Sequence, residues 1–411
     1  MFIHPHIYHF NESGINRTQA TFRRLARRAR IETYCIYSGV LALLNIVAGA
    51  FVISRLPTPH SAGVWLWVAV FYVIQLSGPF GDRLFFANRR RKHTGLIRAI
   101  DWVSYLAFGA MSCLVLYGLA TEVITLIWRL AAPPADEAAF NRGTLLALGL
   151  VTAVTVVIGI VQALMPPKIQ RVDIPLASLP TAFDGFTIAQ VSDLHVGPTI
   201  GRATAQRVAD IVNGLGPDVI ALTADFVDGT VSDLAYDVAP LASLRAKHGV
   251  FFVTGNHEYF WDAGEWIAAF TRLGARVLVN EHVIIRRSDA ALVMAGITDY
   301  STRHMPSEHA SNPKRALADA PADAVKILLA HQPASYTAAA EAGADLQLSG
   351  HTHAGQYFPF SLLIGFFQTF TRGLNRHGKM WIYVNQGTGY WGPPMRTGVP
   401  AEITLLTLRT A

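Results

Sequence analysis

The sequence predicts two structural parts, an N-terminal α-helical membrane domain with four spans and a C-terminal α/β domain. Long apolar runs are concentrated in residues 31–165, whereas residues 166–411 alternate short β-branched runs with helical or loop segments. The whole chain is 51% apolar and only 15% charged, and the first part carries most of that excess. We therefore expect a basic tail, a transmembrane domain, a linker and a globular domain, at residues 1–30, 31–165, 166–184 and 185–411.

Four segments of the first part are apolar enough to cross a bilayer, which takes about 20 residues of helix. They cover residues 34–53, 64–80, 102–121 and 144–165. Their number and length argue against core helices of a soluble protein and against a cleaved signal peptide. We place Glu122 at the end of the third span, as a solvated helix terminus.

Basic residues predict the orientation of these spans, because Lys and Arg collect on the cytoplasmic side of a membrane. One cluster precedes the first span and a second separates spans two and three, whereas the other two connections are poor in basic residues. The clusters are Arg17, Arg23, Arg24, Arg27, Arg28 and Arg30, then Arg83, Arg89, Arg90, Arg91, Lys92 and Arg98. We expect a multi-pass plasma (inner) membrane protein with both termini and the globular domain in the cytoplasm.

The net charge of +6 arises mainly from these clusters, so we expect the lipid bilayer as a partner and no nucleic acid. The basic stretch at residues 22–30 has an alternative interpretation as an amphipathic helix on anionic lipid. The chain has only two cysteines, Cys35 and Cys113, both within apolar segments. This excludes a disulfide framework and a thiolate metal site.

The globular domain shows ten short runs typical of strands, rich in β-branched and aromatic residues. They read FTIAQVS, DVIALTA, GVFFVTG, ARVLVN, HVIIRR, ALVMAGI, VKILLAH, DLQLSG, MWIYVN and EITLLTL. A helical stretch at residues 201–216 joins the first two. Apolar strands with helical crossovers predict a sheet covered on both faces, and such folds place their chemistry at the carboxyl ends of the strands.

Five of these strands end in Asp, Asn or His. The residues are Asp193 and His195, then Asp225, then Asn256 and His257, then His331, and finally His351 and His353. In extended backbone, residues i and i+2 point to the same side, so each Asp-x-His or His-x-His pair can direct two ligands into one cavity. We interpret Asp228 as a brace for the loop of Asp225, and Glu258 as a residue that orients His257.

The donor types predict a metal centre. Leaving His257 aside, two carboxylates, one amide oxygen and four imidazoles are too many ligands for one ion that also binds substrate, and they suit two ions sharing a carboxylate. Mixed oxygen and imidazole ligands favour Mn, Fe or Zn over Ca or Mg. Two such cations attract a phosphate and stabilise the attacking and leaving oxygens of an in-line displacement.

This series of motifs, in this order, resembles the calcineurin-like metallophosphoesterase superfamily over about residues 185–411. The resemblance implies a sandwich of two mixed β-sheets flanked by helices. It implies one metal ion on Asp193, His195 and His353, a second on Asn256, His331 and His351, and Asp225 bridging both. It also implies that His257 is catalytic, contacting phosphate and protonating the leaving group.

One position departs from the family pattern, because Ala224 stands where a glycine usually precedes the bridging aspartate. We expect this small residue to fit the turn. The layout of the whole chain is similar to a bacterial membrane-associated branch that includes UDP-diacylglucosamine pyrophosphatase-like enzymes and small phosphodiesterases.

The leading hypothesis is a membrane-anchored hydrolase that cleaves a phosphoester or pyrophosphate bond of a small-molecule or lipid substrate with metal-bound hydroxide. The alternative is a membrane sensor or scaffold whose phosphoesterase-like domain only binds a ligand. Loss of a metal ligand would favour the alternative, and every ligand position is filled. The oligomeric state stays open.

The apolar run FPFSLLIGFF at residues 358–367 bears on the substrate. It is too short to span a bilayer and is followed by Arg372, Arg376 and Lys379. Two interpretations are open, a helix packed on the core or an interfacial lip in the lipid headgroup region. The second interpretation predicts a lipid-linked substrate.

Overall fold

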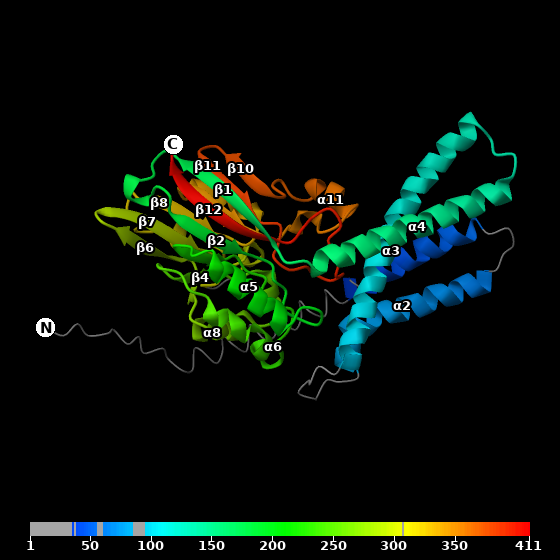
Figure 1. Ribbon diagram of the computed structural model, residues 1–411, viewed down its shortest axis with the longest axis horizontal. Helices are drawn as coiled ribbons and strands as arrows, with labels where there is room; N and C mark the ends of the chain where they lie inside the picture. Colours follow the sequence, from blue (N-terminus) through cyan, green and yellow to red (C-terminus); the bar gives the residue numbers. More distant parts are fainter. Residues whose placement is uncertain (1–34, 37, 56–60, 85–94, 306–307) are drawn as a thin grey trace.

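The computed structural model describes residues 35–36, 38–55, 61–84, 95–305 and 308–411. Its helical half and its α/β half meet where α4 leads into β1 (Figure 1). The basic tail at residues 1–30 and most of the second basic cluster, Arg89 to Lys92, lie outside the described residues.

The helical half contains the helix Ser38–Ile53, α2 (Ser61–Leu84), α3 (Gly95–Ala131) and α4 (Glu137–Leu164). Among the described residues, α3 and α4 are long and apolar enough to cross a membrane, with mean hydropathies of 1.8 and 2.5. The helix Ser38–Ile53 and the apolar part of α2, Gly63–Ser77, are shorter. Two of the four expected spans are therefore supported by length and composition.

The third span was expected to end at Glu122, and this is wrong. Helix α3 continues to Ala131 because the residues after Glu122 are again apolar and helix-compatible. The Glu122 carboxylate pairs with Arg55, whose Nη1 lies 2.5 Å from Oε1. An acid within an apolar helix is tolerated where a cation accompanies it.

The α/β half contains two mixed six-stranded sheets, as the family resemblance implies. In spatial order, the first sheet consists of β1 (Lys168–Leu176), β12 (Glu402–Thr410), β2 (Thr187–Val191), β3 (Val219–Leu222), β4 (Val250–Phe252) and β5 (Arg276–Val277). The second consists of β10 (Gly373–His377), β11 (Met380–Val384), β9 (Leu346–Ser349), β8 (Val325–Leu329), β7 (Ala290–Gly296) and β6 (Glu281–Arg287). Neighbours are parallel except at β12–β2, β10–β11 and β6–β7.

The two sheets pack face to face over an apolar core, which includes Ile188 and Phe251 from the first sheet and Met294 and Ile327 from the second. Helices cover the outer faces. They are α5 (Arg202–Gly214), α6 (Val231–Val238) and α8 (Ala263–Arg272) on the first sheet, and α9 (Pro313–Ala316) and α10 (Tyr336–Glu341) on the second. Both faces of each sheet are thus buried, which explains the continuous apolar strands.

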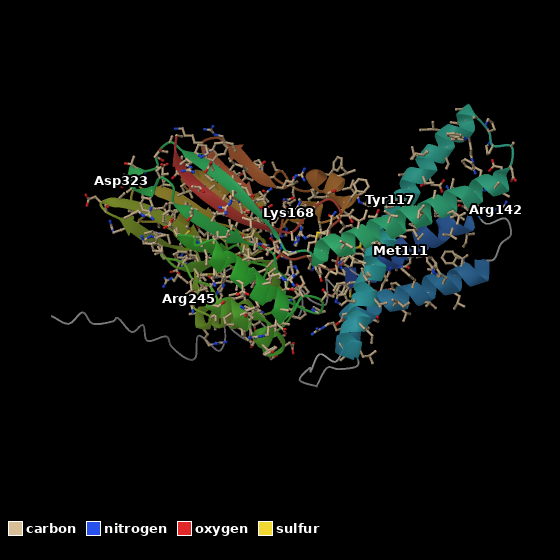
Figure 2. The ribbon with its side chains drawn as sticks, viewed as in Figure 1. Met111, Tyr117, Arg142, Lys168, Arg245 and Asp323 are labelled. Carbon is tan, nitrogen blue, oxygen red and sulfur yellow. The ribbon has the colours of Figure 1, made fainter. Side chains whose placement is uncertain are left out.

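Strand β1 lies inside the range 166–184, where we expect a linker from the sequence. It pairs in parallel with β12, from Lys168 opposite Glu402 onward, so only three residues separate α4 from the sheet. The sequence of β1 lacks the apolar pattern of a strand, because β1 is an edge strand in which only Ile174 and Leu176 are buried. Figure 2 marks Lys168 at this junction and Arg142 at the remote end of α4.

Candidate metal centre

The predicted ligands converge at one edge of the sandwich. Strands β2, β3 and β4 of the first sheet and β8 and β9 of the second all end there, because parallel strands share the direction of their carboxyl ends. In a first group, His353 Nε2 lies 3.1 Å from His195 Nε2 and 3.4 Å from Asp193 Oδ1. All three residues are buried.

A second group lies around Asp225. The Nε2 atom of His331 lies 2.9 Å from Asp225 Oδ2 and 3.3 Å from Nδ1 of His351. In each group the possible ligand atoms lie within 4.8 Å of one another. A further set, formed by His195, Asp225 and His257, shares His195 with the first group and Asp225 with the second.

These residues fit divalent cations. Ligands that bind one ion at about 2.0–2.2 Å lie about 3–3.5 Å apart, close to the spacings seen here. The buried Oδ1 of Asn256 has no hydrogen-bond partner in the described part of the chain, a costly state that a cation would relieve. His331 Nδ1 donates to Thr223 O at 2.9 Å, which orients the ring so that Nε2 faces Asp225, the side on which a metal would bind.

The surroundings of two of the imidazoles lower their pKa values. Burial, with His331 nearby, lowers the pKa of His351 to about 3. Burial, His195 and Arg396 hold the pKa of His353 well below its usual range. Both rings are therefore neutral at pH 7, the form that ligates metal.

Residue His257 forms a partly exposed pair with Asp228, whose side chains are 17% and 18% exposed. Its Nδ1 lies 2.5 Å from Asp228 Oδ1, and its Nε2 lies 3.9 Å from Asp225 Oδ2. Burial disfavours the charged ring, but the Asp225 and Asp228 carboxylates outweigh it and raise the pKa of His257 to about 9. Below that pH the ring carries a proton beside the candidate ligand Asp225.

The backbone at the strand ends is unusual. Five candidate ligands adopt positive φ, namely Asp193 (53°), His195 (52°), Asp225 (52°), His351 (69°) and His353 (48°). An L-residue in the left-handed region costs about 1–2 kcal/mol. Strained backbone of this kind collects at functional sites, so the strain points to the same residues as the sequence motifs.

Comparison with known proteins identifies the family. Residues 186–355 match the family model described as calcineurin-like phosphoesterase. A Danio rerio protein named transmembrane protein with metallophosphoesterase domain is 36% identical over 328 residues, which cover 75% of this chain and 74% of that protein. The Bos taurus protein of the same name is 33% identical over 404 residues, which cover 93% of this chain and 90% of that protein. The chain belongs to the calcineurin-like metallophosphoesterase family.

Membership confirms the resemblance and a hydrolase that acts on phosphoester bonds. A Helicobacter pylori relative, named as an uncharacterized metallophosphoesterase, is 35% identical over 252 residues, or 61% of this chain and 66% of that protein. The two relatives named as transmembrane proteins agree with the apolar helices α3 and α4, and the chain is accordingly a membrane protein. The narrower UDP-diacylglucosamine pyrophosphatase-like branch stays a prediction.

The position that departs from the family pattern adopts a glycine-like conformation, since Ala224 has a φ of 73°. The alanine accommodates the turn at the cost of left-handed backbone. In contrast, an alanine could not replace Gly350 before His351, because a Cβ there would collide with Ser192 Oγ and Asp193 Oδ2. A bare backbone at Gly350 lets the end of β9 approach the end of β2.

Two supporting roles differ from those expected. Asp228 contacts His257 and, at 3.3 Å, His195 Nδ1, so it is a partner of imidazoles and not merely a brace. Glu258 lies at the start of α7 (Asn256–Phe260) and accepts from the N–H groups of Gly255, Asp225 and Phe226 at 2.8–3.1 Å. It joins the loops after β3 and β4 and, in the structure described, does not orient His257 through its side chain.

Sequence reasoning missed two residues in loop 386–399. Arg396 is fully buried, and its Nη2 lies 3.1 Å from His353 Nδ1. The Trp391 ring is half exposed, with its centroid 6.0 Å from that of His257. Their only signal is a Pro- and Gly-rich segment, WGPPMRTG, that surrounds an arginine.

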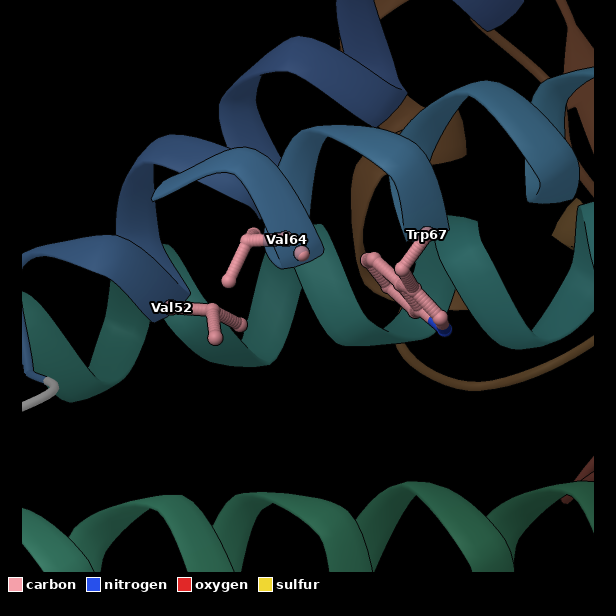
Figure 3. A pocket seen from close by; sticks show the side chains of 4 residues that line it. Val52, Val64 and Trp67 are labelled. Carbon is pink, nitrogen blue, oxygen red and sulfur yellow. The ribbon is translucent and has the colours of Figure 1, made fainter. Parts of the chain in front are cut away.

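A groove between the helix Ser38–Ile53 and α2 lies apart from this chemistry. It is lined by Val52, Gly63, Val64 and Trp67 (Figure 3). The lining is almost entirely apolar and offers no carboxylate or imidazole. The strand-end cluster is therefore the candidate active site.

Proposed function

We propose that this protein is a membrane-anchored phosphoesterase with two divalent metal ions, which hydrolyses a phosphoester or pyrophosphate bond of a lipid-linked substrate at the cytoplasmic face. The observation that carries the chemistry is the pair of largely buried ligand groups, which a third set containing His195 and Asp225 connects. The observation that favours an amphiphilic substrate is an exposed apolar segment next to that cluster.

We assign one ion to Asp193, His195 and His353 and the other to Asn256, His331 and His351, with Asp225 shared. Manganese, iron or zinc suits this mixture of oxygen and nitrogen donors. When bound, such a pair supplies Lewis acidity toward the phosphoryl oxygens and a nucleophile from water at neutral pH.

The role of His257 follows from its pairing. Asp228 accepts the Nδ1 proton, which fixes the ring and leaves Nε2 on the side of Asp225. With a pKa raised to about 9, the ring holds a proton at pH 7 and can donate it from Nε2 to the leaving oxygen as the P–O bond breaks.

The apolar run 358–367 supports an interfacial lip better than a core helix. It forms α11 (Phe360–Leu363) and a 3-10 turn, Ile364–Phe366, neither of which contains a buried residue. The exposed fractions of Leu362, Phe366 and Phe367 are 65%, 83% and 80%. Tyr357 OH lies 3.0 Å from Ser112 Oγ of α3, so the lip begins against a candidate membrane span.

We infer that this lip rests in the cytoplasmic leaflet, where the acyl chains of a lipid-linked phosphate can follow it to the metal centre. Of the seven large apolar side chains that are exposed in the described part of residues 168–411, four lie in this run. The seven are Ile169, Tyr236, Phe358, Leu362, Phe366, Phe367 and Trp391. Burial of such side chains in lipid gains about 25 cal/mol per Å² of apolar surface.

We also propose that the helix Ser38–Ile53 and α2 complete four spans. Helix α2 has 24 residues, or about 36 Å at 1.5 Å per residue, against a hydrocarbon thickness of about 30 Å. An even number of spans with the basic clusters inside puts the catalytic half in the cytoplasm.

The substrate proposal is tested with the double variant Leu362→Ser/Phe366→Ser of the full chain. We expect wild type to show a higher kcat/KM on a lipid-linked phosphate than on its soluble headgroup analogue, and the variant to lose that preference while keeping the soluble activity. The matched control is Tyr236→Ser, because Tyr236 is 71% exposed but lies on α6.

The outcomes separate the two claims. Equal kcat/KM on both substrates, or a parallel loss on both in the double variant, contradicts the lipid substrate alone. If neither substrate is hydrolysed in the presence of manganese, iron or zinc, the proposed phosphoesterase activity is contradicted.

A further inference from the structure

Loop 386–399 contacts the backbone of one candidate metal ligand and the side chain of another. The N–H of Thr388 donates to Ser192 O at 2.7 Å, and that of Gly389 donates to Asp193 O at 2.9 Å. The Arg396 guanidinium lies against His353 on the side of Nδ1, away from the Nε2 that faces Asp193. The position of this loop therefore sets the position of Asp193 and His353.

Arg396 holds the loop in one shape from within. Its Nε donates to Gly389 O at 2.7 Å, and its Nη1 donates to Gln386 O at 3.0 Å. A guanidinium is always charged and has only donors, so a buried one requires acceptors in fixed places. Movement of the loop would leave this buried charge unpaired, at high cost.

The same loop lies on helix α4. The Arg396 N–H donates to Gly159 O at 2.9 Å, and Thr397 Oγ1 donates to Thr155 O at 2.8 Å. A third bond joins the Gly398 N–H to Gln162 Oε1 at 3.0 Å. Three consecutive residues of the loop are thus bound to about two turns of a candidate membrane span.

Glycines in α3 and α4 allow loop 386–399 to pack closely against both helices. A Cβ on Gly159 would lie 2.7 Å from Thr397 Oγ1 and 3.0 Å from Met395 Cβ. A Cβ on Gly109 of α3 would lie 2.5 Å from the Met395 sulfur. Met395 is fully buried in a cluster with Cys113 of α3 and Tyr357. The loop can approach both helices only because these positions lack a side chain.

We propose that α3 and α4 are a structural part of the metal centre, and that Arg396 is the positioning residue that transmits their placement to Asp193 and His353. The inference rests on the proposed metal site. It implies that the membrane half does more than anchor the enzyme, since a shift of α4 would move the loop and with it two candidate ligands.

The test uses the full chain in phospholipid nanodiscs and compares Gly159→Ala with Gly149→Ala. Both positions are in α4, but a Cβ on Gly149 has nothing within 4 Å. Metal-free protein is titrated with Mn²⁺, and its Kd, kcat and Tm are measured. We expect Gly159→Ala to raise the Mn²⁺ Kd about tenfold, because the added methyl group would push Thr397 and Met395 away from α4. Gly149→Ala should match wild type.

A milder variant covers the case in which Gly159→Ala does not fold. Thr397→Val keeps the shape of the side chain but removes the hydroxyl that binds Thr155 O, and we expect it to raise the Mn²⁺ Kd about two- to tenfold. A lowered Tm with a wild-type Mn²⁺ Kd in the folded variants would overturn the inference, because the contact between loop 386–399 and α4 would then stabilise the fold without affecting metal binding. Failure of the wild type to bind Mn²⁺ would instead overturn the proposed function.

Discussion

The pairing of His257 with Asp228 determines what removal of the ring should do at the residue scale. We expect His257→Ala to lower kcat about 10²–10⁴-fold for a poor alkoxide leaving group, because general-acid help has that size. The loss should be much smaller for a good aryloxide leaving group, which departs without a proton. Metal content should stay near that of wild type, since the proposed ligand set is intact.

The measurement is a comparison of kcat for alkyl and aryl phosphates, together with metal analysis. A suitable control is His282→Ala, because the His282 ring lies on β6 and bonds to Ala316 O, away from the strand-end cluster. Equal losses on the two substrates would remove His257 from the role of acid.

Single residues also show how far the sequence alone reaches. Asp193, His195 and the other strand-end residues were predictable because apolar strands place their carboxyl ends at one edge. The partners of Asp228 and Glu258 were not, because each depends on a side-chain direction that spacing does not define. Arg396 had no motif at all, since apart from His353 its partners are backbone carbonyls.

At the scale of elements, the central strands of both sheets were predicted, and the edge strands β1 and β10 were missed. Central strands bury both faces and read as continuous apolar runs, whereas β10 has no fully buried residue. The missed β1 matters most for the architecture, because it connects α4 to the sheet almost without a linker. That short connection helps keep α4 beside loop 386–399.

The segment after His353 illustrates the same limit. Its apolar composition suits a core helix and a membrane lip equally well, and only exposure distinguishes them. Phe366 and Phe367 point away from the core in the folded chain. Tertiary packing, which the sequence does not state, argues against the core helix, and the lip stays a proposal.

At the scale of the whole molecule, the basic clusters predict that the catalytic half faces the cytoplasm. Arg142 lies at the end of α4 remote from the catalytic half (Figure 2), in a connection that the sequence makes poor in basic residues. A reporter fused to the C-terminus should therefore be active only if it functions in the cytoplasm. Protease added to intact cells should leave the catalytic half uncut, and cleavage of that half would contradict this orientation.

The most direct test of the central claim replaces Asp225, the carboxylate that we propose both metal ions share. Asp225→Asn keeps the shape of the side chain but removes its charge, and Asp210→Asn on the exposed face of α5 is the control. Metal content and hydrolysis of an aryl phosphate are measured on the same full-length protein after reloading with Mn²⁺. The account predicts that Asp225→Asn loses bound metal and turnover while Asp210→Asn keeps both. Wild-type metal content and turnover in Asp225→Asn would contradict a two-metal centre built on this residue.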